Sequence, residues 1–355
     1  MKEFRLMKGN EAIAEAAIRY GADAYFGYPI TPQSEILEYL SEHNPSETTG
    51  MVVLQAESEV AAINMVYGAA AAGRKAFTSS SGPGISLMTE GLSYLAGAEL
   101  PCLVINVARG GPGLGTIQPS QADYFQAVKG GGHGDYRLLV LAPASVQEMA
   151  DFTALGFDLA FKYRNPVLIL TDGVIGQMME KVQFPEPRPR NTETVSWAVV
   201  GKPADRDRNV ITSLNLQALI HEQHNIKLQA KYRRMEEEET RYETFFCDDA
   251  EYIVVAYGSS ARISRKAVEL AREQNIKAGL FRPITLFPFP TKELNETAKN
   301  AKGALSVEMN AGQMIEDIRL ALKFRIPVKH FGRYGGVIHA PGEVLEAIKK
   351  DLSSF

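Results

Sequence analysis

Cysteine is scarce in this chain of 355 residues, which contains only Cys102 and Cys247. The two lie far apart in the sequence and form no CxxC pair, so a disulfide scaffold is not expected. An iron–sulfur cluster usually needs four thiolates, which two cysteines cannot supply. The N-terminal segment has no apolar signal-peptide core, and no apolar run approaches membrane-spanning length. These absences predict a cytoplasmic protein.

An excess of basic charge is also missing. The chain has 38 Lys and Arg against 42 Asp and Glu, a net charge of −4, so neither nucleic acid nor an anionic membrane is an expected partner. The 45% hydrophobic content is ordinary for a globular protein. The length exceeds what one average core needs, which favours two domains.

The first half of the chain alternates short apolar runs with segments of helical period. We expect strands at 23–28, 51–55, 75–79, 102–107, 137–142 and 166–171, with helices at 10–20, 57–72, 84–96, 120–129 and 145–163. This alternation predicts a parallel sheet covered by helices. Thr31 and Pro32 are expected to open a further helix, as its N-cap and first residue.

The composition changes in the second half of the chain before the α/β pattern resumes. Residues 183–190 are rich in proline and arginine and should be extended, and 213–243 are charged and helix-forming. The charged helix is either a solvated connector or a subunit contact. Further strands are expected at 252–257, 277–281, 303–308 and 326–331, with helices at 261–274, 312–323 and 341–352. We predict a domain at 1–190, a linker with a charged helix at 191–247, and a domain at 248–355.

Two loops carry candidate chemistry. The segment Gly27-Tyr-Pro-Ile-Thr-Pro32 follows a strand, at the edge where parallel sheets bind ligands. Thr31 offers a hydroxyl there, although a plain N-cap explains it as well. In the loop that begins at Arg109, this cation suits a carboxylate ligand, or it pairs with a neighbouring acid. The glycine spacing at 111–115 differs from that of a dinucleotide loop, which weighs against a nucleotide-binding dehydrogenase.

The helix expected at 57–72 opens with two acids whose faces differ. Glu59 shares a stripe with Ile63, Val66 and Ala70, the spacing of a buried face. Glu57 projects with a more polar set, and a favourable interaction with the helix dipole explains it adequately. A buried, unpaired carboxylate is costly, so Glu59 needs another explanation, such as proton exchange with a bound base.

Two further features of the glycine-rich loops have either a functional or a purely structural interpretation. His133 is either a proton-transfer group or a solvent-facing loop histidine. The segment Ser79–Gly84 closes a strand and brings backbone amides near a ligand, or it is only a turn.

These segments, in this order, resemble the α subunit of 2-oxoacid:ferredoxin oxidoreductases. The matching segments are GYPITP (27–32), QAESEVAAINMVYGAAAAG (55–73), SSSGPG (79–84), VARGGPG (107–113), IQPSQADYFQ (117–126), RPITLFPFP (282–290) and VEMN (307–310). The resemblance implies an α/β fold, in which a pyrimidine-type thiamine diphosphate-binding domain with a parallel sheet precedes a transketolase C-terminal-like domain.

The resemblance also implies roles for individual residues. Glu59 matches the glutamate that hydrogen-bonds N1′ of the aminopyrimidine and so promotes activation of thiamine diphosphate. Thr31 and Arg109 match positions that hold the carbonyl and carboxylate side of the 2-oxoacid. The wall around the pyrimidine is matched by Tyr28, Pro29 and Ile30, and no residue is expected to bind metal.

The diphosphate–magnesium motif of thiamine enzymes, GDG with a later asparagine, is missing. Asp172-Gly173 lacks the leading glycine, and Gly134-Asp135 is followed by tyrosine. The resemblance therefore implies that a β subunit binds the diphosphate and Mg²⁺. Iron–sulfur clusters are expected on partners that include γ and ferredoxin-like δ subunits, and the chain alone should be inactive.

The implied reaction is the CoA-dependent oxidative decarboxylation of a 2-oxoacid to an acyl-CoA, with reduction of ferredoxin, in anaerobic metabolism. The residues most resemble the 3-methyl-2-oxobutanoate (ketoisovalerate) type. Pyruvate and 2-oxoglutarate remain alternatives, and 2-oxoglutarate would need a further cation, for which Lys129 and Arg137 are candidates. A non-catalytic assembly subunit of such a complex is the alternative of another class.

Overall fold

The computed structural model describes residues 3–202 and 204–352, and its largest element is a seven-stranded sheet. Its strands are β2 (Ala24–Gly27), β3 (Val52–Gln55), β4 (Ala76–Ser80), β5 (Cys102–Ala108), β6 (Leu139–Leu141), β7 (Pro166–Asp172) and β12 (Thr285–Phe287). They lie in the order β12-β6-β7-β5-β4-β2-β3. Every pairing is parallel except that of the edge strand β12 with β6. Because β4, β5 and β7 are buried along their whole length, both faces of the sheet must be covered.

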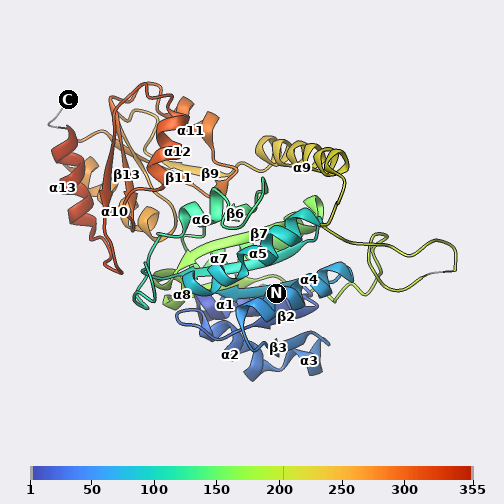
Figure 1. Cartoon of the computed structure of the whole chain (residues 1–355). Coiled ribbons are helices and arrows are strands. Elements are labelled where there is room, and N and C mark those ends of the chain that lie inside the picture. The colour runs from blue at the N-terminus through green and yellow to red at the C-terminus, as the bar shows by residue number, and fades with distance from the viewer. Residues whose placement is uncertain (1–2, 203, 353–355) are drawn as a thin grey trace.

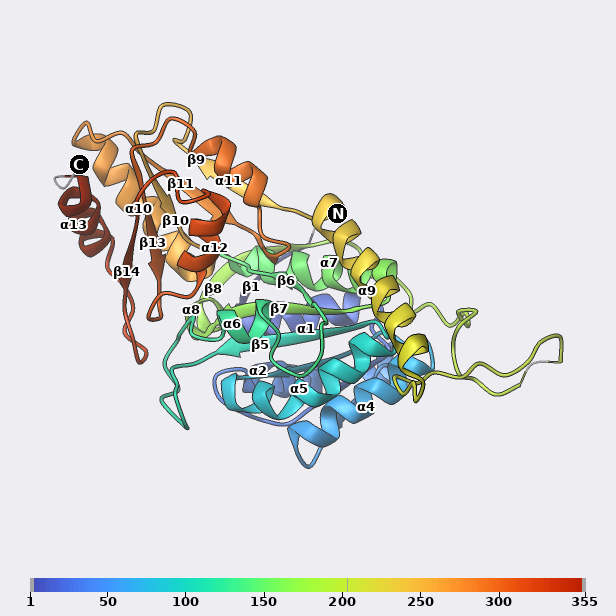
Figure 2. The same cartoon turned by 45° about the horizontal axis from the view of Figure 1, so that its top comes forward.

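Two groups of helices provide this cover. One group comprises α1 (Gly9–Arg19), α2 (Ser34–His43), α7 (Val146–Tyr163) and α8 (Gly173–Gln177), and the other comprises α4 (Glu59–Ala71) and α5 (Gly82–Gly97). Figure 2 shows α4 and α5 together in front of the sheet and α1 behind it. The short helices α3 (Pro45–Thr48) and α6 (Tyr124–Val128) lie in loops. An antiparallel ribbon joins β1 (Glu3–Lys8) to β8 (Met179–Phe184). The predicted helix-covered parallel sheet is confirmed.

A second, five-stranded sheet forms the C-terminal part of the chain, drawn in orange and red in Figure 1. Its strands are β9 (Tyr242–Phe245), β10 (Tyr252–Val255), β11 (Ala278–Pro283), β13 (Gly303–Glu308) and β14 (Val328–Gly332), in the order β14-β13-β10-β11-β9. Its helices are α10 (Gly258–Glu273), α11 (Thr291–Thr297), α12 (Met314–Ala321) and α13 (Pro341–Leu352). Between the two sheets in sequence lies the charged helix α9 (Ala218–Glu238), which confirms the helix expected there.

Two short strands pair with a sheet outside the predicted segment of the chain in which they lie. β9 lies within 191–247 but pairs with β11 of the second sheet, whereas β12 lies within 248–355 but pairs with β6 of the first. Strand β9 has two polar residues at its centre and β12 has only three residues, so neither shows the apolar run or the alternation that marks a strand in the sequence. No helix in residues 3–202 and 204–352 combines the length and apolar character needed to cross a membrane.

The prediction that Thr31 and Pro32 open a helix is wrong. The helix α2 begins at Ser34, with Gln33 at its N-cap, and the Gln33 amide donates 3.0 Å to the carbonyl of Ile30 in a preceding turn. The Gln33 side chain explains this delay, because it accepts from Ser79 Oγ and donates to the Tyr28 carbonyl. These contacts hold the chain in a turn for two more residues before the helix starts.

The two sheets are joined by a buried polar contact centred on Gln121. Its side chain donates to the Tyr257 carbonyl (2.9 Å) and accepts from Ser260 Oγ (2.6 Å) and the Met309 amide (3.0 Å). Its backbone carbonyl accepts from Asn310 Nδ2 (2.8 Å). The contact thus fixes the loop after β5 against the second sheet.

Candidate functional site

The loops singled out in the sequence meet at one edge of the seven-stranded sheet. Gly27 at the end of β2 pairs with Gln55 at the end of β3, and Ser80 of β4 pairs with Asn106 of β5. Because these strands are parallel, the segments that follow all leave from their carboxyl ends. The GYPITP loop, the start of α4, the start of α5 and the Arg109 loop are therefore neighbours.

Glu59 is the first residue of α4. Ser58 caps the helix by accepting a hydrogen bond from the Ala61 amide at 3.2 Å. Glu59 is only 5% exposed, whereas Glu57 is exposed. The stripe Ile63, Val66 and Ala70 is buried as well, so the difference predicted from periodicity is confirmed.

The Glu59 carboxylate lies against a surface from which side chains are excluded. A Cβ built on Gly84 would overlap Glu59 Oε1 and Ser80 Oγ, and would lie 3.0 Å from Glu59 Cδ. Ser80 Oγ is buried and has no hydrogen-bond partner among the described residues. A buried acid beside an unpartnered buried hydroxyl has the capacity to form hydrogen bonds with a bound base.

The GYPITP loop takes its shape from buried hydrogen bonds beneath it. The Tyr25 hydroxyl lies 2.7 Å from Ser79 Oγ, which donates to Gln33, and Gln33 Nε2 donates 3.0 Å to the Tyr28 carbonyl. Burial raises the pKa of Tyr25, so this phenol stays protonated. Within the loop Tyr28, Pro29 and Thr31 are exposed, and Ile30 is half-buried. This backbone is therefore held rigidly while its side chains face outward.

Arg109 and Thr31 are brought together through the backbone. Arg109 Nη1 donates 3.0 Å to the Thr31 carbonyl, and Nη2 donates 3.3 Å to the Leu114 carbonyl. Arg109 makes no ion pair with any acid in the described part of the chain, and its buried Nε has no partner there. The alternative in which Arg109 simply neutralises a neighbouring acid is therefore wrong for these residues.

Two polar side chains near this edge were not recognised in the sequence. Asn106 Nδ2 donates 2.9 Å to Asp123 Oδ2, and burial raises the pKa of Asp123 although this hydrogen bond lowers it. A Cβ on Gly82 would lie 3.7 Å from the same carboxylate, which places Asp123 beside the start of α5. Asn106 interrupts the apolar run CLVINV, and this polar residue in a buried strand was the signal that could have revealed the pair.

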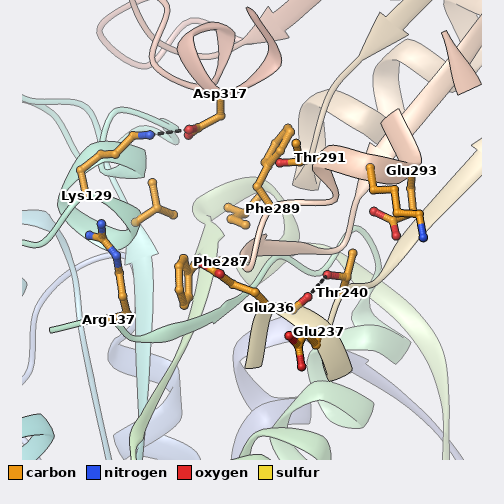
Figure 3. A pocket seen from close by; sticks show the side chains of 13 residues that line it. Lys129, Arg137, Glu236, Glu237, Thr240, Phe287, Phe289, Thr291, Glu293 and Asp317 are labelled. Carbon is orange, nitrogen blue, oxygen red and sulfur yellow. Dashed lines mark hydrogen bonds and ion pairs between the residues drawn. The ribbon is translucent and has the colours of Figure 1, made fainter. Parts of the chain in front are cut away.

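Lys129 and Arg137, the candidate cations for a distal carboxylate, lie in a different place. They line a cavity of about 670 Å³ beside α9 and α11, shown in Figure 3. There Lys129 pairs with Asp317, and the Arg137 guanidinium lies 5.7 Å from the centre of the Phe287 ring. Neither lines the groove beside Thr31. His133 stands in an exposed loop, its ring edge-on to Tyr94 at 5.8 Å.

The fold and these loops define a thiamine diphosphate-binding α/β protein. Residues 15–244 match the family described as pyruvate flavodoxin/ferredoxin oxidoreductase, thiamine diphosphate-binding, and residues 250–344 match pyruvate:ferredoxin oxidoreductase core domain II. The chain belongs to the 2-oxoacid:ferredoxin oxidoreductase family and is a subunit of such an enzyme. The resemblance seen in the sequence is thereby confirmed.

Individual relatives agree over nearly the whole chain. The ketoisovalerate oxidoreductase subunit VorB of Methanothermobacter thermautotrophicus is 54% identical over 346 residues, which are 98% of this chain and 97% of the relative. The 2-oxoglutarate synthase subunit KorA of Archaeoglobus fulgidus is 36% identical, covering 99% and 100%. The structure of 2-oxoglutarate:ferredoxin oxidoreductase from Magnetococcus marinus matches with a TM-score of 0.86 and 27% identity, over 98% of this chain. The chain spans 65% of that protein's chain.

Proposed function

We propose that this chain is the α subunit of an oxidoreductase that converts 3-methyl-2-oxobutanoate, CoA and oxidised ferredoxin to the acyl-CoA, CO₂ and reduced ferredoxin. The observation that carries the proposal is the buried Glu59 carboxylate beside Gly84 and Ser80, at the edge where Thr31 meets Arg109. The relative named for ketoisovalerate is 54% identical, against 36% for the one named for 2-oxoglutarate, which favours the branched substrate.

Each side chain then has a role in the bound complex. Glu59 holds a proton at N1′ of the aminopyrimidine, while Tyr28, Pro29 and Ile30 form the wall beside the ring. Thr31 and Arg109 orient the 2-oxoacid by its carbonyl and carboxylate, since Nη1 and Nη2 of Arg109 each carry a second N–H besides the one donated to a backbone carbonyl. When bound, thiamine diphosphate supplies a nucleophilic carbon and an electron sink.

We further propose that the other end of the cofactor belongs to a partner. Asp172, the acid of this chain's incomplete diphosphate motif, is buried and accepts hydrogen bonds from Ser259 Oγ and the Val174 amide. It is therefore not free to bind a cation. A β subunit would hold the diphosphate and Mg²⁺, and γ and ferredoxin-like δ subunits would carry the clusters, in a cytoplasmic complex.

The test is to co-express the chain with its partner subunits and follow CoA- and thiamine-dependent reduction of a viologen by 2-oxoacids. We expect Glu59→Ala to lower turnover roughly 10²–10⁴-fold, the usual contribution of a positioned proton-transfer group. Glu57→Ala, two residues away and exposed, is the matched control and should retain activity. Undiminished turnover in Glu59→Ala would refute the catalytic role and leave the chain as an assembly subunit.

A further inference from the structure

A second groove, of about 670 Å³, opens directly beside Thr31. The side chains of Val174 and Met178 line it from the segment after β7, and Ile117 lines it from the Arg109 loop. Ile338 completes it from the second domain. Ile117 and Ile338 are 56% and 42% exposed, although both are large and apolar. Apolar side chains from three separate segments, converging on one concavity, are typical of a ligand site rather than of open surface.

Ile338 is held in place by a close approach between two loops. A Cβ on Gly110 would lie 3.1 Å from the carbonyl carbon of Gly335 and 3.2 Å from the Gly336 nitrogen. A Cβ on Gly336 would in turn overlap the side chain of Gln118. The glycines thus let the 335–338 segment lie directly on the Arg109 loop. The position of Ile338 is therefore coupled to that of Arg109.

The groove begins where the 2-oxoacid would be held. Thr31 is part of its lining, and its carbonyl accepts the hydrogen bond from Arg109. The start of α2 and the helix α8 border the groove, and these belong to the helix group that includes α1. Glu59 stands at the start of α4, in the other group. The groove thus extends from Thr31 toward the helix group opposite Glu59.

Charge in the groove is negative. Glu35 lines it, and no lysine or arginine is among the described residues that do. Partial burial would raise the pKa of Glu35, but hydrogen bonds from Gln177 (2.6 Å) and Asn10 (2.9 Å), with Lys8 at 3.5 Å, hold it below its usual value. The carboxylate is therefore ionised at neutral pH. A second carboxylate on the substrate would meet Glu35 and no lysine or arginine in the lining, because Lys8 stands behind Glu35 and is already paired with it.

We propose that this groove receives the branched alkyl side chain of the 2-oxoacid, and that Met178 and Ile338 determine the preference for it. The inference rests on the proposed function and names the residues of the same site that select its substrate. Met178 and Ile338 supply apolar contact for the two methyl groups, and Glu35 disfavours 2-oxoglutarate. The second domain, through Ile338, thus takes part in substrate selection.

The first experiment measures kcat/KM of the assembled complex with 3-methyl-2-oxobutanoate, pyruvate and 2-oxoglutarate. We expect Ile338→Ala and Met178→Ala each to lower the ratio of the branched substrate to pyruvate roughly 10-fold, the effect of lost contacts in an apolar pocket. Ile338→Arg should shift the ratio toward 2-oxoglutarate. Val337→Ala is the matched control, since Val337 is the exposed neighbour of Ile338 and does not line the groove. Equal losses on all three substrates in the groove variants would overturn the proposal while the proposed function stands.

A second experiment does not depend on turnover. The native Cys102 and Cys247 are buried, so a cysteine introduced as Met178→Cys can be followed by mass spectrometry of this chain after alkylation with iodoacetamide. We expect 3-methyl-2-oxobutanoate to slow its alkylation in the assembled complex and 2-oxoglutarate to have little effect; Val337→Cys should respond to neither. Alkylation unaffected by the branched substrate, or a cysteine already covered by a partner subunit, would overturn the proposal. If the wild-type complex oxidises no 2-oxoacid at all, the proposed function itself fails.

Discussion

The carboxylate of Glu59 and the α carbon of Gly84 lie so close together that no side chain fits between them. A Cβ on Gly84 would overlap Glu59 Oε1 and would also reach the unpartnered hydroxyl of Ser80. Glu59 is the first residue of α4 and Gly84 lies in the first turn of α5, and these two helices pack against each other. The absence of a side chain at residue 84 therefore controls where the Glu59 carboxylate rests.

We predict that Gly84→Ala displaces the Glu59 carboxylate and weakens both cofactor binding and turnover. A shift of about 1 Å in a catalytic group costs on the order of 10²-fold in rate. Titration of the assembled complex with thiamine diphosphate and the viologen assay measure the two effects. Gly82→Ala is the control, because its Cβ would meet Asp123 only at 3.7 Å, an ordinary contact. Equal effects of the two substitutions would contradict the specific role of Gly84.

A second prediction concerns the fork of hydrogen bonds made by Arg109. Arg109→Lys keeps the charge but replaces the planar fork, whose Nη1 and Nη2 reach the Thr31 and Leu114 carbonyls separately, by a single ammonium nitrogen. We expect KM for every 2-oxoacid to rise roughly 10-fold, with a smaller change in kcat. Steady-state kinetics of the assembled complex test this. An unchanged KM would remove Arg109 from substrate binding.

A third prediction follows from the buried pair formed by Asp172 and Ser259 across the domains. Burial raises the pKa of Asp172 to about 6, although hydrogen bonds from Ser259 and the Val174 amide lower it. In the unfolded chain this pKa is about 4, so the folded state binds more protons between these values. Asp172 therefore costs stability as pH rises from about 4 through 6. The cost is complete above pH 6 and is on the order of 3 kcal/mol, since each pKa unit corresponds to about 1.4 kcal/mol.

Asp172→Asn should remove that cost, because the Asn side chain does not ionise; its Oδ1 can still accept from the Val174 amide, and its Nδ2 can donate to Ser259 Oγ. We expect the variant to gain stability over the parent as pH rises from 4.5 to 7, measured by thermal unfolding of the purified chain. Below pH 4 the variant and the parent should have nearly equal stability. A difference that does not vary with pH would show that Asp172 does not titrate in this range.

Much of the fold follows from patterns within single segments. The apolar runs at 102–107 and 166–171 and the stripe below Glu59 predict buried strands and a buried acid, and the structure has both. The sequence did not predict strand β12, because its three residues pair with a strand more than 140 residues earlier and no local pattern encodes such a pairing. The start of α2 was misplaced for a similar reason, since Gln33 is held by Ser79 from another strand.

For the site as well, features encoded within one segment could be predicted and long-range contacts could not. Glu59 could be chosen over Glu57 because burial leaves a helical period in the sequence. The hydrogen bond between Arg109 and the Thr31 carbonyl leaves no pattern in the sequence, because it joins residues 78 positions apart and its acceptor is a backbone atom. The contribution of Ile338 was equally hidden. It depends on the second domain folding back over the Arg109 loop, which only tertiary structure determines.

The last prediction concerns the coupling of the two domains by Gln121. Gln121→Leu would leave Ser260 Oγ and the Met309 amide without their buried partner, whereas the Tyr257 carbonyl would keep the hydrogen bond from the Ala261 amide. Each unsatisfied buried group costs about 1–3 kcal/mol, so the loop after β5 should loosen from the second sheet. Faster amide hydrogen exchange at 257–260 and 309–310, and a lower unfolding temperature, would measure this. Gln229→Leu is the control, because Gln229 makes its hydrogen bond, to the Asp135 carbonyl, at the surface. If Ile338 is held over the site by this coupling, Gln121→Leu should also weaken the preference for the branched 2-oxoacid, whereas Gln229→Leu should leave it intact.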